Sequence, residues 1–309
     1  MQQYQWAARA RDIEPFHVMA VLARARALEA QGHDVIHMEI GEPDFTSPEP
    51  IIRAGQAALA AGKTGYTPAL GLPVLREAIA GWYQRQYDID LDPGRVIVTP
   101  GGSASLLLTS ALLVDPGKRV MMADPGYPCN RHFLRLVEGA ATLVPVGPET
   151  QYQLTPELIE RYWTSDCVAV MAASPANPTG TLLDRQQLAE LAAAARRKGA
   201  RLIVDEIYHG LTYGCRASSV LEVDPDAFVL NSFSKYFGMT GWRLGWLVAP
   251  SDAVPDLERL AQNLYICAPH MAQLAALAAF EEETLSICES RREAFGKRRD
   301  FLLPSLREL

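Results

Sequence analysis

Short apolar runs recur between Arg95 and Val248, and helical stretches separate most of them. Runs of this length that are rich in Val, Ile and Leu are typical of strands buried on both faces, as in a parallel sheet. We expect strands at 96–98, 120–122, 141–144, 168–171, 202–204, 228–230 and 244–248. We expect helices at about 104–113, 131–137, 156–163 and 185–198. The alternation predicts an α/β fold with a mostly parallel central sheet flanked by helices.

The two ends of the chain carry other patterns. Apolar residues at helical spacing predict a helix at about 15–32, and further helices are expected at 51–62 and 74–87. A short strand is expected at 34–40, before a loop at 41–48 whose glycine and prolines exclude regular structure. From 269 to 309 the sequence predicts one long helical stretch rich in Ala, Glu and Arg.

Composition excludes several classes of function. Hydrophobic residues make up 49% of the 309 positions and the net charge is -7, so the chain can bury a large core and carries no general attraction for nucleic acid or an anionic membrane. The five cysteines are widely spaced and form no Cys-x-x-Cys pair, which argues against a disulfide framework or a zinc site. We expect no signal peptide, no membrane-spanning segment, no bound metal and a cytoplasmic location.

A glycine-punctuated loop with a single lysine follows the strand expected at 228–230. Lys235 stands close to two hydroxyl residues, Ser232 and Ser234, and Arg243 follows eight positions later. The amine can condense with an aldehyde, while the hydroxyls and the guanidinium can bind a phosphate. Pyridoxal phosphate needs this combination.

The strand expected at 202–204 runs directly into Asp205, and Tyr208 follows three residues later. A carboxylate at the end of a buried strand is costly unless it meets a cation, and a protonated pyridine nitrogen would be one. The alternative is that Asp205 caps the next helix.

Three other loops follow predicted strands. Gly102 and Ser103 open a helix, where backbone N–H groups can bind phosphate or can simply be capped. Tyr127 lies in a proline-bounded turn, either packed on the surface or stacked on a cofactor ring. Asn177 lies between two prolines, and its amide can both donate and accept hydrogen bonds or can serve the turn alone.

Together these loops resemble those of the class I and II aminotransferases, which are fold type I pyridoxal-phosphate enzymes of the aspartate aminotransferase type. The resemblance runs from about Ile13 to the last residue. It implies that Lys235 forms the internal aldimine and moves a proton between the substrate α-carbon and the cofactor. By the same resemblance Asp205 pairs with the pyridine nitrogen, and Tyr208 and Asn177 bind the ring 3-oxygen.

The resemblance also implies the remaining roles. Tyr127 would stack on the ring, and the phosphate would be held by Gly102, Ser103, Ser232, Ser234 and Arg243. Gly41 matches the backbone position that meets the substrate carboxylate, alongside Asn177. Tyr66 matches the tyrosine that reaches the phosphate of the neighbouring subunit, which implies a homodimer. The substrates would be an L-amino acid and a 2-oxo acid.

The resemblance divides the chain into three parts. Residues 1–48 would form an N-terminal arm and part of a small domain, 49–285 the large cofactor-binding domain, and 286–309 the start of an incomplete C-terminal small domain. Family members continue further, and no arginine here matches the late one that clamps the substrate carboxylate. The arginines of the terminal stretch are expected on a solvated face: Arg291, Arg292, Arg298, Arg299 and Arg307.

These features leave alternatives to the aminotransferase hypothesis. We expect cofactor binding with poor transamination unless another chain or an extension completes the site. The same lysine chemistry also serves carbon–sulfur β-lyases and decarboxylases, and release of pyruvate without a keto acceptor would favour a lyase. A truncated module that holds the cofactor or binds a partner is the non-enzymatic alternative.

Overall fold

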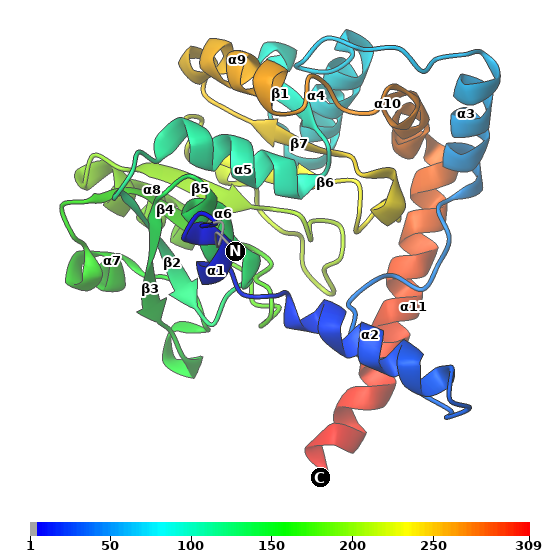
Figure 1. Cartoon of the computed structure of the whole chain (residues 1–309), viewed down its shortest axis with the longest axis horizontal. Helices are drawn as coiled ribbons and strands as arrows, with labels where there is room; N and C mark the ends of the chain where they lie inside the picture. The colour runs from blue at the N-terminus through cyan, green and yellow to red at the C-terminus, as the bar shows by residue number, and fades with distance from the viewer. Residues whose placement is uncertain (1–4) are drawn as a thin grey trace.

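The computed structural model describes residues 5–309 and contains one seven-stranded sheet (Figure 1). Its strand order is β1-β7-β6-β5-β4-β2-β3, and β7 runs antiparallel to both neighbours while the other pairs are parallel. The strands are β1 (Val96–Thr99), β2 (Arg119–Asp124), β3 (Ala140–Pro145), β4 (Cys167–Ala173), β5 (Arg201–Asp205), β6 (Phe228–Ser232) and β7 (Gly245–Val248). The predicted α/β fold with a mostly parallel sheet is confirmed.

Helices cover both faces of the sheet, and each face has its own hydrophobic core. One face packs against α5 (Gly102–Leu113), α6 (Cys129–Leu136) and α9 (Val254–Leu264). The other face packs against α3 (Glu49–Ala60), α4 (Pro73–Tyr87), α7 (Pro156–Tyr162), α8 (Arg185–Arg197) and α10 (His270–Leu277). Burial on both faces explains why the strands read as continuous apolar runs.

The register of the sheet brings the functional loops together. Ala173 at the end of β4 pairs with Asp205 at the end of β5, and Asp205 pairs with Leu230 of β6. Gly245 begins β7 and pairs with Ser232 on one side and Thr99 on the other. The loops after β1, β4, β5 and β6 therefore meet at one edge of the sheet, where α/β proteins bind ligands.

The predicted strand at 34–40 is wrong. The segment forms no regular structure and has no strand partner among residues 5–309, and Ile36 and Met38 are 84% and 81% exposed. A strand needs a neighbour for its backbone groups, which its own sequence does not reveal. The helix expected at 15–32 is present as α2 (His17–Glu29), and a short α1 (Arg9–Asp12) precedes it.

The terminal stretch is helical but interrupted. It consists of α10, a short 3₁₀ turn (Ala278–Phe280) and α11 (Glu282–Arg307), which extends away from the sheet (Figure 1). In residues 5–309, no helix combines the length and the apolar character that a membrane span requires.

Candidate active site

Aromatic residues fix the lysine loop between β6 and β7. Phe233 is fully buried, and its ring lies 4.9 Å from the ring of Trp246 and 5.4 Å from that of Phe237. The Tyr236 hydroxyl donates to Glu289 of α11 over 2.6 Å. These anchors lie on both sides of Lys235 in the chain, so the backbone that carries the lysine is held rigidly.

The Lys235 amine points from this loop toward the turn after β5 and the loop at 41–48. Its Nζ donates to the Gly41 carbonyl over 3.3 Å and lies 5.8 Å from the centre of the Tyr208 ring. Burial lowers the pKa of Lys235, and Arg243 lowers it further, while Glu42 and Asp205 oppose the shift. A lysine with a lowered pKa presents more of the neutral amine that bonds to an aldehyde.

Asp205 ends β5 beside this amine. Its Oδ1 accepts the Ile207 backbone N–H over 3.0 Å, so the carboxylate caps a turn rather than a helix. Loss of solvation raises the pKa of Asp205 to about 6, and the nearby Lys235 opposes the rise. A cation at this position would favour the ionised carboxylate, as a protonated pyridine nitrogen would.

Asn177 and Tyr208 come from neighbouring loops and meet at the site. The Asn177 Nδ2 group donates to the Tyr208 hydroxyl oxygen over 3.2 Å. Burial and the Asp205 charge raise the pKa of Tyr208, and the Asn177 hydrogen bond lowers it. The Tyr208 hydroxyl therefore keeps its proton and can donate it to an oxygen of a ligand.

Tyr127 lies half-buried in the turn after β2. Burial raises its pKa, and neighbouring Cys129 contributes to the rise. The Phe16 ring meets the Tyr127 ring edge-on, with the centroids 6.1 Å apart. The arm before α2 therefore restricts the movement of the ring expected to stack on a cofactor.

The start of α5 lies against the lysine loop. Gly101 has φ 81°, and a Cβ atom there would stand 2.6 Å from Arg243 Nη2. The Ser232 and Ser234 hydroxyls lie 2.9 Å apart. Gly102 is close to Ser232, with 3.7 Å from the Gly102 Cβ position to the Ser232 Cβ atom. Helix N–H groups, two hydroxyls and a guanidinium thus converge on one anion site, and Ser103 is exposed in the first turn of α5.

The residues present fit pyridoxal phosphate. Side chains at Gly101 or Gly245 would fill the cradle, since a Cβ atom on Gly245 would lie 2.8 Å from the Gly102 nitrogen. The donor set suits a phosphate dianion, and Asp205, Asn177 and Tyr208 suit the nitrogen and the oxygen of a pyridine ring. The Lys235 amine suits the aldehyde.

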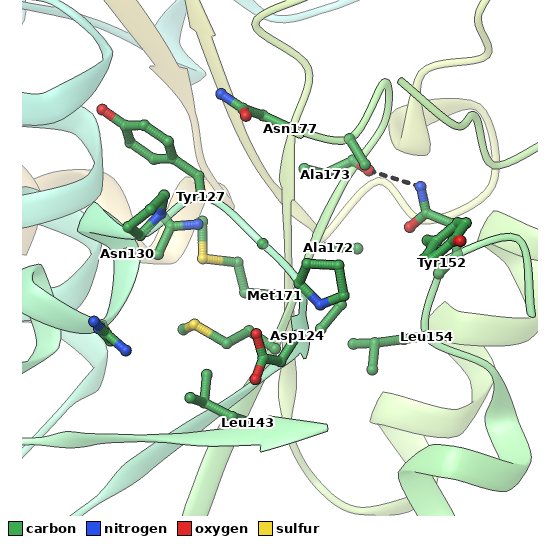
Figure 2. A pocket seen from close by; sticks show the side chains of 18 residues that line it. Asp124, Tyr127, Asn130, Leu143, Tyr152, Leu154, Met171, Ala172, Ala173 and Asn177 are labelled. Atoms are coloured by element: carbon green, nitrogen blue, oxygen red, sulfur yellow. Dashed lines mark hydrogen bonds between the residues drawn. The ribbon is translucent and has the colours of Figure 1, made fainter. Parts of the chain in front are cut away.

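A cavity of about 180 Å³ adjoins the site on the side of Tyr127. Figure 2 shows Tyr127 and Asn177 on one side of this cavity, while Leu143 and Leu154 line two other sides. Lys235, Ser232 and Arg243 are not among its lining residues. The cavity is therefore a neighbouring chamber rather than the cradle itself.

Gly41 and Tyr66, whose roles were implied by the resemblance, differ in whether they reach the site of their own chain. Gly41 reaches the site, since its carbonyl accepts from Lys235. Tyr66 does not, because its side chain is 82% exposed in the loop between α3 and α4.

The terminal arginines are not simply a solvated face. Arg298 pairs with Asp44 over 2.8 Å, and the guanidinium groups of Arg298 and Arg291 lie 5.3 and 5.2 Å from the centre of the Phe45 ring. Arg292 donates to Glu289 and to the Thr212 carbonyl. The expectation was wrong for Arg291 and Arg292, which are partly buried because α11 packs beside the loop at 41–48 and the segment around Thr212. Arg298, Arg299 and Arg307 are exposed, as expected. Arg299 stacks on Tyr213, with 4.6 Å to the ring centre.

Sequence reasoning missed several residues around the site. Glu42 acts on the Lys235 pKa, and Phe16 contacts Tyr127. Glu206 and His209 lie fully or almost fully buried beside Asp205 and Tyr208. Two adjacent acidic residues after an apolar strand were the available signal for Glu206. The face to which each side chain turns depends on the turn geometry.

Comparisons with known proteins find similar sequences that belong to one family. The family model "Aminotransferase class I and II" matches residues 33–309. Valine–pyruvate aminotransferase of Mycobacterium tuberculosis is 38% identical over 299 residues, which are 96% of this chain and 77% of that protein. Aspartate aminotransferase of Geobacillus stearothermophilus is 32% identical over 97% of this chain and 77% of its own length.

Solved structures give the same result. The crystal structure of an aminotransferase from Mycobacterium tuberculosis superposes with a TM-score of 0.95 at 38% identity, covering 99% of this chain and 79% of that one. Aspartate aminotransferase from Thermus thermophilus with maleate has a TM-score of 0.94 at 33% identity, with 99% and 81% covered.

Proposed function

This chain belongs to the class I and II aminotransferases, and we propose that Lys235 is the residue through which it binds its cofactor. The chain is a pyridoxal-phosphate-dependent aminotransferase, which moves an amino group from an amino acid to a 2-oxo acid. When bound, pyridoxal phosphate acts as an electron sink for negative charge at the substrate α-carbon. One observation carries the Lys235 assignment: the amine lies 5.8 Å from the centre of the Tyr208 ring, in surroundings where burial lowers its pKa.

Lys235 has two tasks in this proposal. Its Nζ atom would hold the cofactor at the aldehyde carbon, and as a free amine it would carry a proton from the substrate α-carbon to the cofactor carbon. The second task needs the neutral form, and the burial that lowers the pKa of Lys235 supports it. The Gly41 carbonyl, 3.3 Å from Nζ, directs the amine.

The ring of the cofactor would be bound by residues from three loops. Asp205 would pair with the pyridine nitrogen and keep it protonated, because an ionised carboxylate raises the pKa of a cation beside it. The Tyr208 hydroxyl and the Asn177 amide would bind the ring 3-oxygen, and their mutual hydrogen bond of 3.2 Å supports a shared target. Tyr127 would stack on the ring.

The phosphate would occupy the anion site at the start of α5. Gly102 and Ser103 would give backbone N–H groups at the positive end of the helix dipole, and the side chains of Ser232, Ser234 and Arg243 would complete the set. The close packing of Gly101 against Arg243 supports this assignment.

Two further roles concern the substrate and a second subunit. Gly41 and Asn177 would meet the substrate carboxylate, which their places beside Lys235 and Tyr208 support. Tyr66 would reach the phosphate of a second copy, forming a homodimer with shared sites. Its 82% exposure leaves the side chain available for such a contact.

The domain division and the location are part of the same proposal. Residues 49–285 would form the large domain, since they hold all seven strands. Residues 1–48, of which 1–4 lie outside the described part, and 286–309 would belong to the small domain. All five cysteines are free, which supports the reducing cytoplasm.

Borohydride reduction of the cofactor-loaded protein tests the Lys235 assignment. Reduction fixes the cofactor to the lysine that holds it, so the peptide containing Lys235 should gain the cofactor mass. Lys235→Ala should abolish both the visible absorption band and the labelled peptide, while Lys297→Ala, an exposed lysine on α11, should change neither. A label on any other lysine would refute the assignment.

A further inference from the structure

The turn after β5 has two faces. Asp205 and Tyr208, three residues apart, belong to the cofactor side, where they neighbour Lys235 and Asn177. Glu206 and His209 have the same spacing, and their side chains turn into the core, where they are 0% and 7% exposed. The His209 N–H donates to the Glu206 carbonyl over 2.9 Å, which closes the turn. The contacts that hold Glu206 and His209 in the core therefore also set the directions of Asp205 and Tyr208.

Glu206 is anchored through one carboxyl oxygen. Its Oε1 accepts the Ser219 hydroxyl over 3.0 Å and the Val220 N–H over 2.8 Å. Its other oxygen, Oε2, is buried without a hydrogen-bond partner among the described residues. The Glu206 N–H donates to Leu230 of β6, which ties the residue to the sheet.

His209 faces this second oxygen. Its Nδ1 lies 3.5 Å from Glu206 Oε2 and 2.8 Å from the Tyr87 hydroxyl oxygen of α4. Nδ1 of a neutral His209 has one lone pair, so at any moment it accepts from either a protonated Glu206 or the Tyr87 hydroxyl, and the first of these gives Oε2 the partner that it lacks. The three side chains then form a neutral chain of polar groups inside the core.

Burial favours the neutral forms. It raises the pKa of Glu206 to about 8, with Glu222 and Asp205 adding to the rise, and it lowers the pKa of His209 to about 4. Burial thus favours the protonated form of Glu206 and the neutral form of His209. Since Asp205 is the next residue, a neutral Glu206 leaves a single negative charge at this turn.

The other polar groups around Glu206 do not supply a cation. From α4, Tyr83 binds Trp246 Nε1 through its hydroxyl at 3.2 Å, and burial raises its pKa. Arg216 lies 5.2 Å from the centre of the Tyr87 ring. Arg216 and Arg185 pair with Glu222 at 3.8 and 3.7 Å.

We propose that Glu206, in its protonated form, is a positioning residue for Asp205 and Tyr208, acting with His209 and Tyr87 as a neutral hydrogen-bonded support beneath the cofactor site. The proposal rests on the cofactor roles proposed for Asp205 and Tyr208. Glu206 touches neither cofactor nor substrate in it. The support sets the direction of the turn and leaves its only negative charge on Asp205, where a pyridinium ion can meet it.

The first experiment measures the protonation of Glu206 without any cofactor. Glu206→Gln keeps the shape and places an amide N–H toward His209, so it imitates the neutral acid permanently. The parent protein takes up a proton at Glu206 on folding, so this residue's contribution to stability falls as pH rises from 4.5 to about 8. Thermal unfolding of the cofactor-free proteins across this range should show a flatter pH dependence for Glu206→Gln than for the parent.

A control variant removes an exposed glutamate instead. Glu283→Gln, at the start of α11, should follow the pH dependence of the parent. If Glu206→Gln also follows the parent, Glu206 is ionised in the folded protein and the proposal fails. This result does not depend on the cofactor, so it separates the proposal from the assignment of Lys235.

The second experiment measures positioning. Glu206→Leu keeps much of the volume but leaves Ser219, Val220 and His209 without their partner, and pyridoxal phosphate should bind about tenfold more weakly, as expected for hydrogen bonds lost in the core. Glu206→Gln should restore most of that affinity. Tyr87→Phe, which removes only the hydroxyl on His209, should also weaken binding and provides the test if the Leu variant does not fold. If Glu206→Leu binds pyridoxal phosphate as tightly as the parent, Glu206 does not position Asp205 and Tyr208. If that variant does not fold, parent-like affinity in Tyr87→Phe would refute the proposal in the same way.

Discussion

Gly245 lies so close to Gly102 that a Cβ atom at position 245 would stand 2.8 Å from the Gly102 nitrogen. The same atom would stand 2.8 Å from the Asn231 carbonyl oxygen, so both obstacles are backbone. Because β7 lies between β1 and β6, this contact joins the start of α5 to the lysine loop. Because residue 245 has no side chain, the start of α5 and the lysine loop, which form the two halves of the anion site, can pack this closely.

Gly245→Ala should open this contact. The backbone must shift to admit the methyl group, at a cost of about 1–3 kcal/mol, and the N–H groups of α5 should move away from Ser232 and Arg243. We expect lower thermal stability and a higher dissociation constant for pyridoxal phosphate, measured by fluorescence titration. Gly241→Ala, in the same loop with open space around its Cβ position, is the matched control and should change neither. Parent-like affinity in Gly245→Ala would separate this contact from phosphate binding.

Asn177 and Tyr208 should act as a pair. Their side chains share a hydrogen bond of 3.2 Å, and both are proposed to bind the same cofactor oxygen. Asn177→Ala and Tyr208→Phe should each reduce kcat/KM, and the double variant should lose less than the sum of the two single losses. A coupling energy of about 0.5–3 kcal/mol is expected for residues in one network. Strict additivity of the two losses would mean that the residues act independently.

The pKa of Lys235 should respond in opposite directions to two nearby charges. Glu42 raises it and Arg243 lowers it, so Glu42→Gln should lower the pKa and Arg243→Gln should raise it. The cofactor-free proteins can be labelled with an amine reagent at several pH values, and the label on the Lys235 peptide can be quantified by mass spectrometry. The other lysine peptides of each digest correct for reagent strength. Shifts of the same sign in both variants would refute the proposed balance.

Much of the fold could be predicted because its strands are buried on both faces. Runs such as 168–171 and 202–204 are apolar throughout, and the structure has strands at these places. The segment at 34–40 mixes apolar residues with Asp34, His37 and Glu39, and whether such a segment forms a strand depends on a partner elsewhere in the chain. The antiparallel direction of β7 had a weaker signal, the lack of a crossover helix between β6 and β7.

The sequence could predict where the loops of the candidate site lie, but not the buried residues beneath them. Lys235 and Gly102 follow strands in stretches where glycine and serine mark an irregular backbone, Asp205 is the last residue of an apolar strand, and the sheet brings all three to one edge. Glu206 stands next to Asp205 in the sequence, yet its function depends on the direction of its side chain. That direction is fixed by Ser219 and Val220, which are more than ten residues away. Contacts of this kind cannot be read from spacing.

Mixed dimers should reveal whether Tyr66 serves the neighbouring subunit. In Lys235→Ala no site can hold the cofactor covalently, and in Tyr66→Ala both sites should bind it weakly. If Tyr66 acts across an interface, a mixed dimer combines intact Lys235 from one copy with intact Tyr66 from the other and restores one of its two sites. Random exchange would then leave about a quarter of all sites with parent affinity.

The experiment mixes the two purified variants under mild denaturant, removes the denaturant, and titrates pyridoxal phosphate while following its visible absorption. A tight phase should appear in the mixture and in neither variant alone, and its amplitude should follow the fraction of mixed dimers. Tyr66→Ala mixed with itself under the same conditions controls for refolding. If Tyr66 contacts only its own subunit, mixing brings no intact pair together, because every copy with Lys235 still lacks its tyrosine. Absence of the tight phase, with exchange verified by mass spectrometry, would therefore rule out the shared site.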